Sequence, residues 1–436
     1  MGRRLLQAML NALEPDDPLR LPTDLWFESS GYRRREEKTR NAHVGTLLGT
    51  VVLWRRGYRS WEQDGGSIFP FEMFLGLTES VSPALADWLG RQMAEAGATQ
   101  QGVLKRLKSE CNVAMGVKRL RACTEQLSDA LSELRQAHQV DVLLNALKEA
   151  QASRGNRKPV LSVGRDGITL REYTYSFYEV ATAATVSVYD RAGKRLTTVY
   201  LAWPPELGQA TMDSMLTDLL TELLTSWQGP LPRLAYVADA GSNESGYFER
   251  VLRRLRHPLT NRPLEWTRVV DYYHAAERLF SMAAAMFGKH TRKGNAWARR
   301  MQKLLKKPNG ASRVLHSAAA LFHRRKLSKT RQADFWQAYR YLQKRTKFLR
   351  YAEFASKHIP IGSGVTEAAC KTIFTQRLKL SGMRWTRAGA KTILGLRVIL
   401  LSGTWSSTFL SHLSKLNPTD LRPYIQPNRK HPRITA

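Results

Sequence analysis

Three carboxylates in this sequence have the residue type and the placement for metal-dependent phosphoryl transfer. Asp166 follows the apolar run "VLSVGR" and Asp239 follows "RLAYVA", so each is predicted to lie where a buried strand ends. Because ligand sites in open α/β sheets form at the carboxyl ends of strands, these two side chains should converge if the strands are neighbours. Two carboxylates a few ångströms apart repel each other unless a cation or a proton lies between them. Such oxygen ligands suit Mg²⁺, which keeps several waters for substrate phosphates.

Glu367 is the candidate for a third carboxylate. It lies in "KHIPIGSGVTEAACKTIF", just after a glycine-flanked turn and on a predicted helix. Sites with two metal ions hold them about 3.5–4 Å apart and clamp the attacking and leaving oxygens of a phosphoryl transfer. Each acid also has a plain structural alternative: Asp166 in an Asp-Gly turn, Asp239 as a helix cap, and Glu367 as the i,i+4 partner of Lys371.

Almost the whole net charge of +31 lies in the last third of the chain. Residues 1–288 hold 36 Lys/Arg against 33 acids, whereas residues 289–436 hold 32 against four. Such asymmetry indicates a polyanion partner, most often nucleic acid, although a merely basic, solvated surface is the alternative. Residues 289–357 carry 20 Lys/Arg and two acids, which predicts a clamp on the DNA backbone that includes Arg324, Arg325 and Lys326. The aromatic residues interleaved there are expected to be mostly core.

The elements that must position the three acids follow the order β-β-β-α-β-α-β-α over residues 159–288, which predicts a mixed sheet covered by helices. Before it we expect a loose lead-in (1–40), then a β-hairpin with a break near Gly49 and three helices (41–152), and a linker at 153–159. After it we expect an all-helical basic insertion (289–358), the last helices of the catalytic core (359–405) and a basic tail (406–436).

Two of the N-terminal helices, "QQGVLKRLKSE" and "VAMGVKRLRACTEQLSDALSELRQ", have the length and the short junction of a helix-turn-helix. Lys118, Arg119 and Arg121 would then lie early in the second helix, where base contacts are made. A plain helical hairpin is the first alternative. The second is a dimerisation seam along an apolar stripe, which comprises Val117, Leu120, Leu127, Leu131 and Leu134.

The three cysteines form no CxxC pair, which argues against a disulfide framework and against a Cys-rich zinc site. No apolar run approaches the roughly 18 residues needed to cross a membrane. The expected location is therefore the reducing cytoplasm, with no membrane partner.

Several segments together resemble one protein family. "DG" after a strand, "AD" after another strand, "DYYHAAERL", "PIGSGVTEAACK" and "QRLKLSGMRW" are similar to motifs of bacterial insertion-sequence DDE transposases of the ISKra type, a group related to the Mutator-like transposases. The resemblance covers roughly residues 40–405, and the last two motifs are the long and specific ones. The chain departs from the family pattern at Arg165 and at Ala240, where a small or apolar residue and a glycine are expected.

The resemblance implies an RNase H-like catalytic domain with an all-helical insertion, preceded by a β-hairpin and a helical DNA-binding region. Its metal ligands map onto Asp166, Asp239 and Glu367, with two Mg²⁺ or Mn²⁺ ions per active site. "DYYH" matches a D-x-x-H motif and adds Asp271 and His274 to the catalytic residues.

The implied activity is that of a DNA transposase, which cuts element ends and joins them to target DNA. Its partner would be double-stranded DNA, bound by a homodimer or higher oligomer at the bacterial nucleoid. A stand-alone metal-dependent nuclease and a non-catalytic, transposase-derived DNA-binding protein are the alternatives. Further DNA contacts are expected on the segment around and after Glu367, at Lys371, Arg377, Lys379, Arg384 and Trp385. Trp385 is expected to be either a stacking platform for a base or a core residue.

Overall fold

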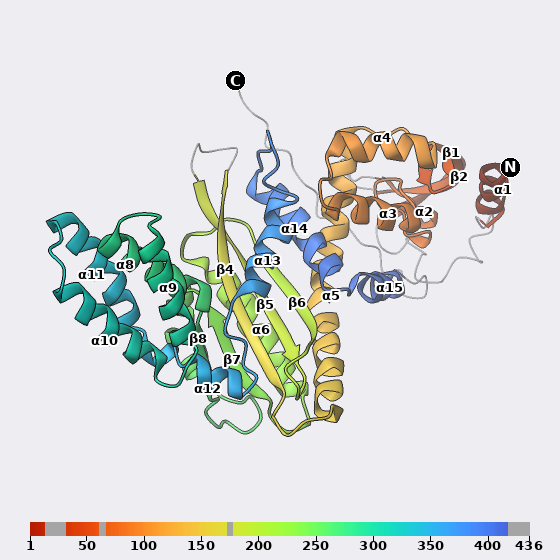
Figure 1. Cartoon of the computed structure of the whole chain (residues 1–436). Helices are drawn as coiled ribbons and strands as arrows, with labels where there is room; N and C mark the ends of the chain where they lie inside the picture. The colour runs from red at the N-terminus through yellow and green to blue at the C-terminus, as the bar shows by residue number, and fades with distance from the viewer. Residues whose placement is uncertain (14–31, 61–66, 172–177, 417–436) are drawn as a thin grey trace. The chain divides into compact units, whose positions relative to one another are not determined.

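The computed structural model of the chain describes residues 1–13, 32–60, 67–171 and 178–416 (Figure 1). The chain divides into two compact units, one of Met1–Leu134 with Trp405–Ala436 and the other of Arg135–Thr404. The boundary falls inside the 36-residue helix α5 (Val117–Ala152) and not at the linker expected over 153–159.

The first unit contains an antiparallel sheet in the order β1-β2-β3. β1 (Tyr32–Thr46) and β2 (Gly49–Ser60) form the predicted hairpin, which turns at Gly49 with a φ of 118°. β3 (Ser67–Ile68) pairs with the end of β2. The expected loose lead-in contains a helix and the start of a strand. The helices of this unit are α1 (Gly2–Leu13), α2 (Pro70–Phe74), α3 (Pro83–Ala94), α4 (Gln100–Cys111), the first half of α5, and α15 (Trp405–Lys415).

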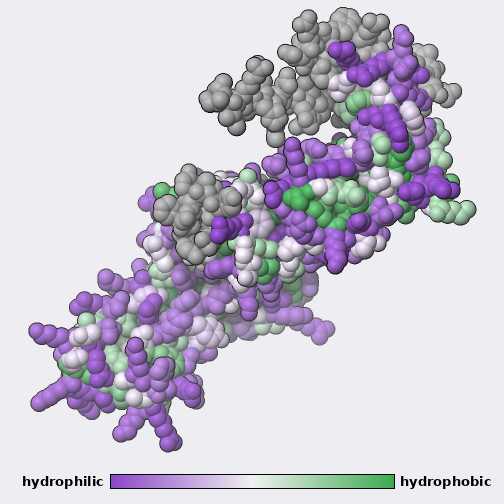
Figure 2. Space-filling view, turned by 90° about the horizontal axis from the view of Figure 1, so that it is seen from above, coloured by the Kyte–Doolittle hydropathy of each residue, from purple (hydrophilic) through white to green (hydrophobic). Residues whose placement is uncertain are grey.

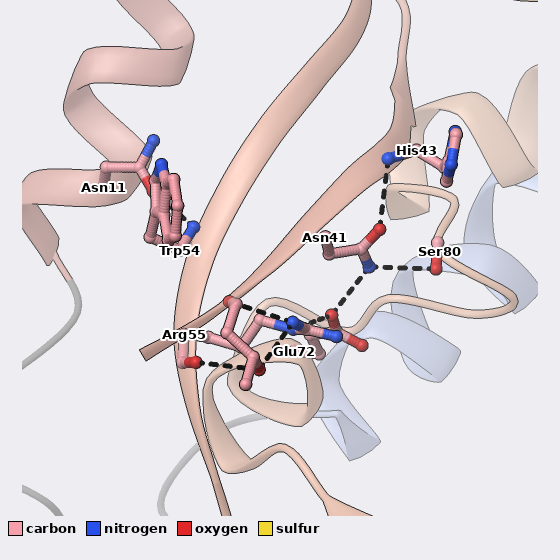
Figure 3. A network of polar contacts seen from close by, with 8 residues as sticks. Asn11, Asn41, His43, Trp54, Arg55, Glu72 and Ser80 are labelled. Carbon is pink, nitrogen blue, oxygen red and sulfur yellow. Dashed lines mark hydrogen bonds and ion pairs between the residues drawn. The ribbon is translucent and has the colours of Figure 1, made fainter. Parts of the chain in front are cut away.

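A polar network fastens α1 and α2 to the hairpin (Figure 3). Asn11 of α1 accepts a hydrogen bond from the backbone N–H of Trp54 at 2.8 Å. Arg55, which is buried, donates to Glu72 of α2 at 2.5 Å, and the Asn41 amide donates to the same carboxylate at 2.7 Å. Because both strands of the hairpin bind one carboxylate of α2, that helix is held in register with them.

The apolar stripe of α5 is packed inside the first unit. Leu120, Leu127 and Leu131 are all buried. A Cβ on Gly90 of α3 would lie 2.5 Å from the Leu127 side chain and 3.0 Å from that of Trp405, so the glycine allows the helices to approach closely. These leucines therefore form intramolecular core, which corrects their reading as a free dimerisation seam.

The second unit contains a mixed five-stranded sheet in the order β6-β5-β4-β7-β8. β4 (Val160–Arg171), β5 (Tyr178–Tyr189) and β6 (Arg195–Trp203) pair antiparallel, whereas β7 (Arg233–Ala238) and β8 (Trp266–Val270) extend the sheet parallel to β4. The helices between and after them are α6 (Ala210–Ser226), α7 (Ser242–Arg250) and α8 (Tyr272–Phe287), with short 3₁₀ turns η4 (Leu207–Gln209) and η5 (Leu252–Arg254). The predicted series β-β-β-α-β-α-β-α is confirmed.

Helices cover both faces of this sheet. Leu161 and Val163 of β4 pack with α6, α7 and the second half of α5 on one face. Ala235 and Val237 of β7 belong to the other core, which they share with α8 and the helices after it. Because side chains alternate along a strand, odd-numbered positions of β4 and even-numbered positions of β7 face α6 and α7. This alternation decides which face Asp166 and Asp239 reach.

Residues 289–358 form the predicted helical insertion, gathered beside the β8 edge of the sheet (Figure 1). Its elements are α9 (Arg292–Leu305), α10 (Gly310–His323), α11 (Lys329–Gln343), η6 (Thr346–Phe348) and α12 (Tyr351–Ser356). Trp297 and Phe335 are buried, and Trp336 and Tyr339 pack against the same core, so the aromatic residues are core as expected. The left end of Figure 2, where these helices lie, presents mostly hydrophilic side chains.

The chain returns to the sheet through α13 (Gly364–Cys370), a π-helical turn η7 (Lys371–Thr375) and α14 (Arg387–Leu401). In the described parts of the chain, no single helix has both the length and the apolar character to cross a membrane. Only α14 and α15 taken together, as a bent pair, pass by length and composition.

Candidate metal centre

Asp166 and Asp239 lie at the same level of the sheet on neighbouring parallel strands. The parallel pairing of β4 with β7 ends at Val163 and Tyr236, three residues before each aspartate. β4 does not end at Asp166, as the sequence suggested, but continues to Arg171 while paired with β5 alone. The register of β4 and β7, continued for three residues, therefore places Asp166 level with Asp239.

Asp271 continues this row on β8. The pairing of β7 with β8 ends at Ala238 and Val270, one residue before Asp239 and Asp271. The backbone N–H of Asp271 donates to the Ala238 carbonyl at 3.0 Å. Asp271 is fully buried and caps α8, because its carboxylate accepts a hydrogen bond from the His274 N–H at 2.8 Å. Three aspartates thus hold equivalent positions on three successive strands.

α13 brings Glu367 over the face on which Asp166 lies. The Thr366 hydroxyl shares a hydrogen bond of 2.8 Å with the Thr185 hydroxyl of β5. A Cβ on Gly164 of β4 would collide with Thr366, and Gly164 lies two residues before Asp166, so both belong to one face of the strand. The side chain of Glu367 is 46% exposed and lies at the open side of the centre.

Ser363 connects Asp271 to Glu367. Its backbone N–H and its hydroxyl both donate to Asp271 Oδ2, the hydroxyl at 2.9 Å. The same hydroxyl lies 2.9 Å from Glu367 Oε1. These hydrogen bonds connect the turn before α13 to the N-terminus of α8. Asp271 therefore holds Ser363 in place, and Ser363 in turn contacts Glu367.

Asp271, His274 and Glu367 form the tightest group of possible metal ligands. One ligand atom from each lies within 4.8 Å of the other two, and no other group of three meets this criterion among the residues that the structure describes. His274 Nε2 lies 3.7 Å from Glu367 Oε1. Asp166 and Asp239 are outside this group. The ligand atoms of the expected set, Asp166, Asp239 and Glu367, therefore do not all lie within 4.8 Å of one another.

Electrostatics nevertheless connect Asp166 to Asp239 and Glu367. Burial raises the pKa of Asp166, hydrogen bonds from the Gly167 N–H and the Cys370 thiol lower it, and the charges of Asp239 and Glu367 raise it again, for a net increase. Burial and the neighbouring Asp166 charge raise the pKa of the Cys370 thiol, which stays protonated and donates to Asp166. A cation would relieve the repulsion that Asp166 experiences.

Glu244 is a fifth acid of the centre, and the sequence reasoning missed it. It lies in the first turn of α7 and is 8% exposed. Burial and the charges of Asp239 and Asp166 raise its pKa to about 7, although its own backbone N–H and the Arg165 charge act in the opposite direction. A Cβ on Gly241 would collide with Glu244 Oε2 and lie 2.9 Å from Asp239 Oδ1, so a larger residue there would displace these carboxylates. The sequence signal that could have indicated Glu244 is its position three residues after Gly241, the residue that precedes α7.

His274 lies among carboxylates. Burial lowers its pKa, but the charges of Asp271, Glu277 and Asp239 and a hydrogen bond with Glu277 outweigh burial and raise it. Nδ1 lies 3.3 Å from Glu277 Oε2, one turn further along α8. The D-x-x-H residues, Asp271 and His274, therefore meet at the start of a helix, as their spacing suggested.

Arg165, one of the two departures from the family pattern, has a structural role. Arg165 points to the face opposite Asp166, is buried, and donates to Asp213 at 2.6 Å and to Gln209 at 3.0 Å. It therefore occupies no space on the Asp166 face.

Ala240 connects the helical insertion to the centre. Its carbonyl accepts a hydrogen bond from Arg345 Nη2 at 3.3 Å, and the Arg345 guanidinium stacks on Tyr341 at 4.0 Å. The insertion thereby supports the loop that follows Asp239.

The three basic residues proposed for a recognition helix differ in their surroundings. Arg119 donates to the backbone carbonyls of His43, Glu79 and Ser80 at 2.7–2.8 Å, so it fastens the fold of the first unit. Arg121 donates to the Gln100 side chain of α4. Lys118 is exposed. Arg119 therefore has a structural role in the first unit, and base contact by Lys118, Arg119 and Arg121 stays a prediction.

The C-terminal candidates divide in the same way. Arg377 is 1% exposed and lies under the Trp385 ring at 5.2 Å, and the Trp385 indole N–H donates to the Leu378 carbonyl. Arg377 is therefore buried in the turn after α13 and is not exposed for a DNA contact, whereas Trp385 is half-buried and its role as a stacking platform stays a prediction. Three cations of this segment are exposed and remain candidates: Lys371, Lys379 and Arg384.

Within the insertion, Arg325 is also committed to the fold. It donates to the Met286 carbonyl at the end of α8 at 2.9 Å and stacks on Phe287 at 4.0 Å. Arg324, Arg325 and Lys326 are all exposed, and the internal contacts of Arg325 distinguish it from its two neighbours. The backbone clamp expected at these three positions can use two of them without loss of an internal contact.

The donor set of this centre fits a divalent cation. Asp166, Asp239 and Glu367 offer only carboxylate oxygens, the ligands of Mg²⁺ and Mn²⁺. Burial is the main cause of the raised pKa of Asp166, and the charges of Asp239 and Glu367 add to it, so a bound cation would favour the ionised carboxylate. The class of protein that this geometry defines is a mixed α/β protein with a carboxylate-rich centre at the ends of its parallel strands. The chain matches no protein-family model, and no curated protein matches it significantly.

Proposed function

We propose that this protein is a DDE-type polynucleotidyl transferase, a DNA transposase of an insertion sequence, with Asp166, Asp239 and Glu367 as its metal ligands. The observation that carries the proposal is the register of β4 and β7. It puts two aspartates at one level of the sheet, while α13 brings a glutamate over the same face. The strand order, three antiparallel strands followed by two parallel ones, is also that of an RNase H-like domain, and we include that fold identity in the proposal.

When bound, two Mg²⁺ or Mn²⁺ ions would stabilise the charge that develops on the phosphate and on the attacking and leaving oxygens. The chain supplies orientation. The Gly167 N–H at 2.7 Å and the Cys370 thiol hold Asp166, and the Gly241 N–H holds Asp239 at 2.8 Å. Ser363 holds Glu367. Asp166 and Asp239 are therefore each oriented by a backbone donor before substrate arrives, and Glu367 is oriented by a hydroxyl that it shares with Asp271.

The charge distribution favours DNA as the substrate. The insertion over 289–357 has 20 Lys/Arg against two acids, and its aromatic residues are used in its core. Its outer surface is thus left to cations that can pair with phosphates. Because the insertion also supports the loop after Asp239 through Arg345, DNA bound there would lie beside the carboxylates.

The proposal is tested with Asp166→Asn, Asp239→Asn and Glu367→Gln, assayed on DNA that carries the sequences on both sides of the gene. Each change removes one ligand charge, and we expect strand cleavage to fall by about 10³-fold or more with DNA affinity retained. Glu353→Gln, at a surface ion pair of the insertion, is the matched control. Near wild-type cleavage by any one of the three variants would exclude that residue from the centre.

Joining separates a transposase from a stand-alone nuclease. We expect the protein to insert pre-cut ends with free 3′-hydroxyls into target DNA. Cleavage without any joined product would favour a nuclease with the same carboxylates. DNA binding with neither activity would favour a non-catalytic derivative.

A further inference from the structure

The ligand group Asp271, His274 and Glu367 differs from the proposed catalytic set because it contains an imidazole. We propose that these three residues form a separate position for a first-row transition-metal dication, which binds through His274 Nε2, and that Glu277 orients the imidazole for it. The position shares Glu367 with the proposed transposase site, but its occupation does not depend on DNA chemistry.

The contacts of the imidazole assign its two nitrogens different roles. Nδ1 lies 3.3 Å from Glu277 Oε2, whereas Nε2 lies 3.7 Å from Glu367 Oε1. A carboxylate accepts hydrogen bonds only, so the Nδ1 proton is the one that Glu277 can bind. In that tautomer Nε2, which lies 3.7 Å from Glu367 Oε1, is the nitrogen with a lone pair for a cation. Metal-binding histidines show the same arrangement, with the other ring nitrogen held by a carboxylate that sets the tautomer.

Asp271 retains the capacity for one more partner. Oδ1 accepts one hydrogen bond, from the His274 N–H, and Oδ2 accepts two, from the N–H and the hydroxyl of Ser363. A carboxylate has about four lone-pair positions, so one remains on Oδ1. These contacts fix the orientation of the Asp271 carboxylate, which is fully buried.

The shared hydroxyl of Ser363 leaves one carboxylate contact without a hydrogen. Ser363 Oγ lies 2.9 Å from both Asp271 Oδ2 and Glu367 Oε1. A hydroxyl has one hydrogen and can donate to only one of them at a time. The remaining contact brings oxygen lone pairs together beside two carboxylates, and a cation bound by both carboxylates would offset this repulsion.

The mixed donor set indicates the class of cation. Mg²⁺ prefers oxygen ligands in near-ideal octahedral geometry, whereas imidazole favours transition metals. Two carboxylates with one imidazole, open on the side of the exposed Glu367, leave positions for water or for a phosphate oxygen. Mn²⁺ is the suitable probe, since it accepts both ligand types and is paramagnetic.

The experiment is pulsed electron paramagnetic resonance of Mn²⁺ added to the full chain, without a histidine tag and without DNA. We expect electron spin echo modulation from a directly bound ¹⁴N nucleus, and its loss in His274→Ala. His323→Ala, at an exposed histidine of the insertion, should retain the signal. Glu277→Gln should keep the fold and weaken Mn²⁺ binding by about 10-fold or more, as loss of an orienting carboxylate does.

The inference is overturned if bound Mn²⁺ shows no ¹⁴N modulation in the wild-type chain, or if the modulation persists in His274→Ala. Unchanged Mn²⁺ affinity in Glu277→Gln would remove Glu277 from the proposal. Asp166→Asn separates this inference from the proposed function. If all variants and the wild type fail to cut DNA but the ¹⁴N signal of Asp166→Asn matches that of the wild type, the cation position stands while the transposase proposal falls.

Discussion

Asp239 and Asp271 hold equivalent positions on adjacent parallel strands, each directly after the last paired residue of its strand. The pairing runs to Ala238 and Val270, and the Asp271 N–H donates across to the Ala238 carbonyl at 3.0 Å. The spacing of the two carboxylates is therefore set by backbone hydrogen bonds of the sheet and not by loops. A centre built on strands holds its geometry more closely than one built on connecting segments.

Asp271→Ala should destabilise the protein because three hydrogen bonds converge on this buried carboxylate. Loss of the helix cap and of the partner of Ser363 should reduce the free energy of unfolding by roughly 2–4 kcal/mol. Urea denaturation followed by circular dichroism measures this. Glu367→Gln, on a half-exposed side chain, is the control and should change stability by less than about 0.5 kcal/mol. Equal midpoints for the two variants would contradict the structural role of Asp271.

Arg165→Met should be destabilising, although it replaces the residue that departs from the family pattern. Its guanidinium is buried and pairs with Asp213, so the change leaves that carboxylate without its closest cation. Breaking such a pair costs roughly 3–5 kcal/mol. Arg250→Ala is the matched control, because Arg250 contacts the same aspartate at 3.5 Å from an exposed position. We expect a change near zero there. A stable Arg165→Met variant would show that the buried pair is dispensable.

The metal-free protein should lose stability as the pH rises from 5 to 8. Glu244 has a pKa raised from 4.5 to about 7 by burial, so the folded chain binds this proton more tightly than the unfolded chain. That contribution is complete below pH 4.5 and disappears as the pH passes 7, with a ceiling of about 3.5 kcal/mol at about 1.4 kcal/mol per pKa unit. Asp166, whose pKa is also raised, adds a change of the same sign.

The measurement is the urea midpoint in chelator at several pH values. Glu244→Gln should flatten this dependence, whereas Glu265→Gln, at an exposed position, should not. A profile that is equally steep in Glu244→Gln would mean that other groups carry the titration.

Arg324→Ala combined with Lys326→Ala should weaken DNA binding without a loss of stability, because both side chains are exposed. If both contact phosphates, the slope of log affinity against log salt should become shallower by about 1.8, at roughly 0.9 per contact. Element ends and random DNA should be affected alike. Arg325→Ala is the contrasting variant. It should lower the melting temperature, since Arg325 binds the end of α8. An unchanged slope in the double variant would mean that these cations face solvent only.

Much of the second unit could be predicted from local patterns. The strand and helix series over 159–288 and the helical insertion follow from the change between two-residue and helical periodicity. The aromatic residues of the insertion were expected in its core because they repeat at helical spacing, and Trp297 and Phe335 are buried there. The division of the chain inside α5 was not predictable, because a helix that crosses a boundary between units has no break in its pattern.

The roles of individual cations could not be predicted. Arg119, Arg325 and Arg377 look like their neighbours in a basic sequence, yet the first two bind backbone carbonyls of distant segments and the third is buried. Every residue has a backbone carbonyl, so residue types do not show which carbonyl an arginine will bind. The sequence gives the net charge and the segment that carries it. Which cations are exposed and which bind other parts of the fold is decided by packing.

By itself, the sequence determined that acids follow two apolar strands, that a glutamate follows a glycine-rich turn, and that the positive charge is concentrated after residue 288. Only the tertiary structure decided which acids meet. The register of β4, β7 and β8 aligns Asp166, Asp239 and Asp271, Gly241 admits Glu244, and Ser363 ties Glu367 to the row. Strand register and close approach result from pairing between residues far apart in the chain, and local periodicity contains no information on such pairing.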